Sequence, residues 1–198
     1  MAEITSEMIK DLREKTQAGM LDCKKALVEC GGDMDKAVES LRKKGLASAS
    51  KKMGREAKEG IVASYIHTNN KIGVLLELNS ETDFVARNAD FQELARELCM
   101  QVAAANPLYI SPEDVPASEI EKEREIYREQ MKESGKPAAV VEKIIDGKMK
   151  KYYSDVCLLE QESIRDSKVV IKDLINNKIA TYGEKITVGR FVRFQIGK

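Results

Sequence analysis

The chain has 198 residues, with 33 basic and 33 acidic side chains and a formal net charge of zero. Proteins that bind the DNA or RNA backbone usually carry a basic excess, because neutralising phosphates supplies most of their non-specific affinity, so the balanced charge disfavours that class. A hydrophobic content of 42% without Trp indicates a globular protein with an aliphatic core. We expect one sizeable core and a smaller module, with no direct binding of nucleic acid.

Membrane insertion and export are not expected. The N-terminal residues lack the apolar region of a signal peptide, and no run approaches the roughly 18 apolar residues of a membrane span. The four cysteines (Cys23, Cys30, Cys99 and Cys157) lack metal-ligand or redox spacing. We therefore expect a cytoplasmic protein with buried, reduced thiols, without a metal site and without a cofactor.

Glycines divide the first 45 residues into three short helices. The first helix is predicted to begin at a Thr5 or Ser6 cap, and the second ends at residues 31–32. The third begins at Asp33 and ends at Gly45. Each has apolar residues at helical spacing: Met8, Ile9, Leu12 and Thr16, then Met20, Cys23, Leu27 and Cys30, then Met34, Ala37, Val38 and Leu41. Residues 1–45 are predicted to be a three-helix module.

Residues 46–58 are small and basic, which favours a linker or an exposed helix before a core domain over residues 59–198. Two alternating segments on either side of residues 68–70 predict a hairpin, and the Asn pair there suits a tight turn. Asp90 and Glu93 have the spacing of a capping box, which predicts a helix that ends at residues 106–107.

The rest of the core is predicted to be helical except for a final strand. The helix over 117–133 is highly charged, and its thin apolar stripe of Ile120, Tyr127 and Met131 favours a helix that is solvated or lies along a partner. Two more helices follow, the last ending at Gly183, and residues 186–196 form a strand. The order of strands, helices and strand predicts an α+β domain with a small antiparallel sheet packed by helices on one face.

Asp83 and Phe84 stand side by side where the second strand passes into a helix, within the hexapeptide TDFVAR at residues 82–87. If both side chains project outward, a carboxylate beside an exposed ring could repel and wedge a partner. The alternative is an ordinary helix entry, in which Thr82 or Asp83 caps the helix and Phe84 or Val85 lies under its first turn. The pattern alone leaves both interpretations open.

Catalytic motifs are absent from the sequence. Residues 31–32 lack the strand and the Lys-Ser/Thr pair of a phosphate-binding loop. A thiol enzyme would need a His base, and His67 is the single candidate, in an alternating strand that explains it without catalysis. The chain is therefore expected to be a binding protein and not an enzyme.

Five segments carry a resemblance to a known family: LREKT and AGMLDCKKAL at residues 12–16 and 18–27, ELNSETDFVARN at 77–88, GKMKKYY at 147–153 and CLLEQ at 157–161. Together they resemble translation elongation factor Ts in its short bacterial form. The likeness runs nearly from end to end, and two long signatures in the right order are far more specific than one short motif.

This resemblance implies a guanine nucleotide exchange factor for the GTPase elongation factor Tu. It implies that Thr82, Asp83, Phe84 and Val85 enter the GTPase and displace its Mg²⁺ ion, so that GDP leaves and GTP can rebind. It also implies that residues 1–45 are a ubiquitin-associated-like module that docks on the GTPase through Arg13, Met20 and Leu21. The short form is implied to pair with itself, so a homodimer is expected.

A second interpretation keeps the three-helix module as a ubiquitin-associated-type adaptor fused to an unrelated scaffold. It accounts for residues 1–45 equally well, but it leaves the Asp83-Phe84 pair unexplained.

Overall fold

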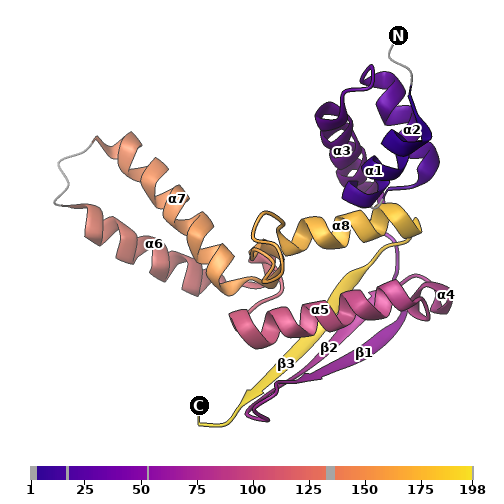
Figure 1. Ribbon diagram of the computed structural model, residues 1–198. Helices are drawn as coiled ribbons and strands as arrows, with labels where there is room; N and C mark the ends of the chain where they lie inside the picture. Colours follow the sequence, from indigo (N-terminus) through magenta and orange to yellow (C-terminus); the bar gives the residue numbers. More distant parts are fainter. Residues whose placement is uncertain (1–3, 17, 53, 133–136, 198) are drawn as a thin grey trace. The chain divides into compact units, whose positions relative to one another are not determined.

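The computed structural model describes residues 4–16, 18–52, 54–132 and 137–197 (Figure 1). The chain forms two compact units, one of residues 1–64, 75–97 and 172–192, the other of residues 65–74, 98–171 and 193–198. The elements in chain order are α1 (Ser6–Thr16), α2 (Met20–Glu29), α3 (Met34–Lys52), β1 (Glu59–Ile66), β2 (Ile72–Ser80), α4 (Asp83–Ala86), α5 (Ala89–Ala105), η1 (Pro112–Asp114), α6 (Ala117–Met131), α7 (Ala138–Val156), η3 (Leu158–Glu160), α8 (Ile171–Tyr182) and β3 (Thr187–Gln195).

The predicted α+β fold is confirmed. The strands form one antiparallel sheet in the order β1-β2-β3, with β2 in the centre. Because side chains alternate along a strand, Val74, Leu76 and Leu78 of β2 are buried while Leu75 is exposed. At the turn of the predicted hairpin, Asn70 alone of the Asn pair has a positive φ, at 56°.

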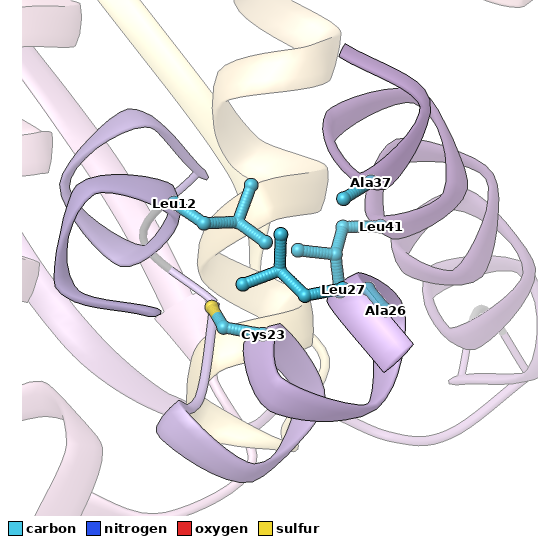
Figure 2. Close-up of a cluster of buried hydrophobic side chains, with 6 residues drawn as sticks. All are labelled: Leu12, Cys23, Ala26, Leu27, Ala37 and Leu41. Atoms are coloured by element: carbon cyan, nitrogen blue, oxygen red, sulfur yellow. The ribbon is translucent and has the colours of Figure 1, made fainter. Parts of the chain in front are cut away.

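The three N-terminal helices enclose a core of their own (Figure 2). Side chains from all three meet there: Leu12, Cys23, Ala26, Leu27, Ala37 and Leu41. Thr5 caps α1, since its Oγ1 accepts the Met8 N–H at 3.2 Å, and Asp33 Oδ1 accepts the Lys36 N–H at 3.1 Å before α3. The three-helix module predicted from the spacing is present.

The prediction that the third helix ends at Gly45 is wrong, because α3 continues to Lys52. A glycine inside a helix costs about 1 kcal/mol relative to Ala, an amount that tertiary contacts can offset. Here α3 has partners on both sides of Gly45: Arg42 forms an ion pair with Asp173, and Lys52 Nζ donates to the Ile179 carbonyl at 3.4 Å. The helical alternative for residues 46–58 therefore holds as far as Lys52, and the domain boundary at residue 45 stays a prediction.

The predicted capping box at Asp90 and Glu93 is also misplaced. Helix α5 begins at Ala89, and Asn88 Oδ1 accepts the Asp90 N–H at 2.9 Å. The cap lies earlier in the sequence, at Asn88, because α4 ends at Ala86 and α5 begins at Ala89, so that Asn88 lies between the two helices. The predicted end holds, since α5 stops at Ala105, before Asn106 with its positive φ of 49°.

In the second unit, α6 and α7 pack against each other. The stripe of Ile120, Tyr127 and Met131 is half-buried, and Lys148 Nζ lies 4.9 Å from the centre of the Tyr127 ring. Charged pairs link the same two helices, among them Arg124 with Asp146 at 3.0 Å. The charged helix thus finds its apolar partner within its own chain.

The thiols lie largely in the cores. Burial raises the pKa of Cys99 to about 11 and that of Cys157 to about 11, and it also raises the pKa of Cys23. Because the thiolate is the reactive form, these buried cysteines are poor nucleophiles. Within the described ranges, no helix combines the length and the apolar character that crossing a bilayer requires.

Two leucines of α2 provide a matched test of the module's core. Leu27 is fully buried and Leu21 is 74% exposed. Leu27→Ala leaves a cavity and should lower the free energy of unfolding by about 2–5 kcal/mol, whereas Leu21→Ala should change it by less than about 0.5 kcal/mol. Urea unfolding followed by circular dichroism measures both variants, and equal losses would contradict the assignment of the core.

Candidate functional site

The segment 82–85 lies at a corner between β2 and the single turn of α4. Thr82 is the N-cap, with an extended backbone (φ −129°, ψ 155°) and an Oγ1 atom that accepts the Val85 N–H at 3.5 Å. Val85 and Ala86 are buried, with 5% and 4% of their surfaces exposed, whereas Phe84 is 83% exposed. The structure therefore combines parts of both sequence interpretations: Thr82 caps and Val85 packs inward, while Phe84 points to solvent.

The acidic side chain of the corner is partly neutralised. Asp83 Oδ2 lies 2.9 Å from an Arg87 guanidinium nitrogen, one helical turn on, and both side chains are well exposed. Exposed pairs of this kind contribute at most about 1 kcal/mol, so a partner's charged group could replace Arg87 at little cost. Asp83 and Phe84 are thus side by side on the surface and available for contact.

The backbone of the corner is restrained by two carboxylates. Glu184 Oε2 accepts the Thr82 N–H at 3.0 Å, and Glu184 Oε1 accepts the Thr82 hydroxyl at 2.7 Å. In the opposite direction, Glu81 Oε1 accepts the Lys185 N–H at 2.6 Å. We refer to these two carboxylates and their partners as the carboxylate clamp.

The Glu81 side of the clamp has a further partner. The guanidinium of Arg55 donates to both carboxylate oxygens, at 3.2 and 3.3 Å. The Lys185 N–H, and secondly Arg55, hold the pKa of the Glu81 carboxyl below its ordinary value. The carboxylate form that makes these bonds is thus the favoured one.

A second candidate surface, the docking patch, consists of Arg13, Met20 and Leu21. Arg13 is exposed on α1, next to the buried Leu12. Met20 and Leu21 open α2 directly after Gly19 and are 45% and 74% exposed. Since α2 directs Cys23, Ala26 and Leu27 inward, its first two residues are left on the outside. The helical spacing of the sequence predicts Met20 among the core side chains of α2, but in the structure 45% of its surface is exposed.

Two residues near these surfaces were not predicted from the sequence. Val28 is 59% exposed and follows Leu21 by seven residues, so it lies on the same side of α2 and extends the apolar surface. The seven-residue spacing is the signal that identifies it. Glu184 lies 102 residues from Thr82 in the sequence, and nothing in the local pattern indicates that contact.

Metal binding and thiol catalysis have little support in the described residues. No group of three or more His, Cys, Asp or Glu side chains within them could hold a metal ion. The single His of the sequence, His67, is hydrogen-bonded through Nδ1 to the Tyr65 hydroxyl at 3.0 Å. The buried thiols with raised pKa values are unsuited to nucleophilic attack.

Comparison with known proteins extends over almost the whole chain. The sequence model of the family described as Elongation factor TS matches residues 3–198. Elongation factor Ts of Fervidobacterium nodosum is 61% identical over 99% of this chain and 100% of its own length. That of Oleidesulfovibrio alaskensis is 61% identical over the full length of both chains, and that of Thermodesulfovibrio yellowstonii is 58% identical over 98% and 97%.

The family match includes the three-helix module and the sheet-containing core alike. The core is therefore not an unrelated scaffold attached to an adaptor module. With relatives of the same length that are 58–61% identical, the chain belongs to the elongation factor Ts family.

Proposed function

We propose that this protein is a guanine nucleotide exchange factor that binds elongation factor Tu in the cytoplasm and promotes the release of GDP. It acts by binding and carries out no reaction of its own. The observation that carries the proposal is the 83% exposure of Phe84 directly beside the buried Val85 and Ala86. A large aromatic side chain at a well-anchored corner has no role in the core and is suited to enter a partner.

The mechanism follows from the chemistry of nucleotide-bound Mg²⁺. The ion bridges phosphate oxygens and protein ligands in a demanding octahedral geometry. Packed protein interiors respond to an inserted side chain by shifting as units. Insertion of Phe84 would displace the segment of the GTPase that supports the ion, the Mg²⁺ shell would be lost, and GDP would leave because its phosphate charge is no longer neutralised.

The docking patch has a separate role in this proposal. Arg13, Met20 and Leu21 would hold the GTPase without acting on its Mg²⁺ site. Apolar side chains with this exposure at the start of α2 form a surface that a partner could cover. Binding and exchange would then depend on different residues, which makes them separable by mutation.

The role of Phe84 can be tested by Phe84→Ala. Loss of a ring that fills a partner pocket costs roughly 2–4 kcal/mol, so GDP release at saturating concentration should slow by roughly 30- to 1000-fold. Asp83→Asn should slow it less, since the shape is kept and only the charge is lost. Stopped-flow fluorescence with labelled GDP bound to elongation factor Tu measures both rates.

Exchange couples two ligands, so the factor by which this protein weakens GDP equals the factor by which GDP weakens this protein. Phe84→Ala should therefore also reduce the difference between its affinities for GDP-bound and nucleotide-free elongation factor Tu. A variant that melts earlier but releases GDP normally per folded molecule would contradict the proposal.

The docking patch can be tested with point variants. Deleting residues 1–50 would cut through α3, so Leu21→Ala is the cleaner change. It should raise the concentration needed for half-maximal GDP release several-fold, while the maximal rate stays within about twofold, because a contact made equally in all states changes only binding. A lowered maximal rate with unchanged half-saturation would contradict this separation of roles.

We also propose that the protein forms a homodimer, through the outer face of its sheet. Within the first unit, each strand exposes an apolar side chain there: Val62 from β1, Leu75 from β2 and Val192 from β3. These three side chains line a shallow hollow of about 330 Å³. The apolar stripe of α6 was one expected site for a partner. Because α6 packs against α7 of the same chain, the sheet face is the better candidate for the dimer interface.

The charges on this face favour a second copy as its occupant. Arg190 Nε donates to Glu77 at 2.8 Å, which leaves no net charge from this pair to repel an identical surface. The Asn79 amide, and then Arg190, lower the pKa of Glu77, so the carboxylate stays ionised and paired near neutral pH. Two such sheets could pack face to face as in a β-sandwich.

Two exposed apolar side chains of the first unit provide the test of the dimer. Val62 is 70% exposed on the sheet face, and Phe84 is 83% exposed at the corner. Light scattering should give twice the 22.2 kDa of one chain for the wild type and for Phe84→Asp, but a single-chain mass for Val62→Asp. A wild-type protein that stays at the mass of one chain at tens of micromolar, roughly where a weak symmetric contact is populated, would refute the dimer.

A further inference from the structure

Thr82 is held at every one of its polar atoms. Its N–H and hydroxyl donate to Glu184, as described above, and its carbonyl accepts the Ser80 hydroxyl at 2.8 Å. Ser80 is itself fully buried, so this last bond is anchored in the core. Because the Thr82 hydroxyl donates its one hydrogen bond to Glu184, the lone pairs of Oγ1 remain available, and Oγ1 accepts the Val85 N–H of α4.

Helix α4 cannot fix its own direction. It has only four residues, Asp83–Ala86, and a single helical turn is not stable by itself because forming the first turn restrains several residues for one hydrogen bond. Its cap bond from Val85 is long, at 3.5 Å. The burial of Val85 and Ala86 keeps Phe84 out of the core, and the contacts that hold Thr82 then set the direction of the ring.

Glu184 is placed for this purpose by the end of α8. Gly183 follows the last residue of α8 and has a positive φ of 75°, a conformation that glycine adopts without strain, and the chain turns there toward β3. The Gly183 N–H still donates to the Ile179 carbonyl at 3.0 Å, so the turn is continuous with the helix. Glu81 and Lys185 then close the clamp from the other side at 2.6 Å.

We propose that Glu184 is a positioning residue for exchange: by binding both the N–H and the hydroxyl of Thr82, it holds the corner in the one orientation in which Phe84 can enter the GTPase. This inference rests on the proposed function and adds a residue outside the 82–85 segment to it. Glu184 itself contacts neither nucleotide nor Mg²⁺ in this proposal, and it acts through Thr82 and Phe84.

The kinetic consequence is specific. The docking patch holds the two proteins together whatever the corner does, so a loosened corner still forms the complex. Within that complex, Phe84 would have the orientation for insertion for only a fraction of the time, and the rate of GDP release would fall to that fraction of the wild-type rate. Loss of Glu184 should therefore lower the maximal rate and leave the half-saturating concentration nearly unchanged.

The test compares Glu184→Ala with Glu59→Ala, an exposed glutamate at the start of β1 in the same unit. Stopped-flow release of labelled GDP from elongation factor Tu is measured over a range of concentrations of each variant. Glu184→Ala should lower the maximal rate about tenfold, which corresponds to about 1.4 kcal/mol, with half-saturation within about twofold. Glu59→Ala should match the wild type. Should Glu184→Ala fail to fold, Glu184→Gln, which keeps one acceptor oxygen, should show a smaller loss of the same kind.

The double variant Glu184→Ala/Phe84→Ala distinguishes positioning from a general structural role. If Glu184 acts through Phe84, its loss should have almost no further effect once Phe84 is gone, so the two effects are non-additive. Additive losses, or a Glu184→Ala protein with a normal maximal rate, would overturn the inference. If Phe84→Ala alone releases GDP normally, the proposed function has failed instead, whatever Glu184→Ala does.

Discussion

Burial of Val85 and Ala86, the last two residues of α4, keeps the two side chains before them out of the core. In one helical turn, residues that face the core and residues that face solvent alternate within a few positions, so Asp83 and Phe84 cannot follow Val85 inward. The apolar contact inside the corner is therefore what exposes the ring outside it. Both the proposed insertion of Phe84 and its proposed orientation by Glu184 depend on that small buried anchor.

The N-terminal module illustrates the same principle at a larger scale. Its core of small and medium side chains requires α2 to turn Cys23, Ala26 and Leu27 inward, and this leaves Leu21 and Val28 on the opposite side. A stable fold and an apolar docking surface thus arise from one helical pattern. Because the module has a core of its own, a change at its surface need not disturb the carboxylate clamp.

Local sequence patterns were sufficient for features that neighbouring residues determine. The caps at Thr5, Asp33 and Thr82, the hairpin turn and the helix end before Asn106 all follow from residue types within a few positions. The patterns failed where distant residues decide. Gly45 does not end α3, because contacts of Arg42 and Lys52 with residues more than 100 positions away hold the helix together. The pairing of α6 with α7, the contact of Glu184 with Thr82 and the exposure of Phe84 all depend on tertiary packing.

The unbroken course of α3 through Gly45 has a consequence for how such a chain can vary. The helix carries Ala37 and Leu41 in the module core near its start, and Lys52 donates to the Ile179 carbonyl at its end. Inserting one residue between these points would rotate one end about 100° against the other and shift it about 1.5 Å along the axis. Both sets of contacts could then not form together. The stretch from 42 to 52 is therefore fixed in length by the contacts at its two ends, although its small and basic composition is typical of a spacer that tolerates insertions.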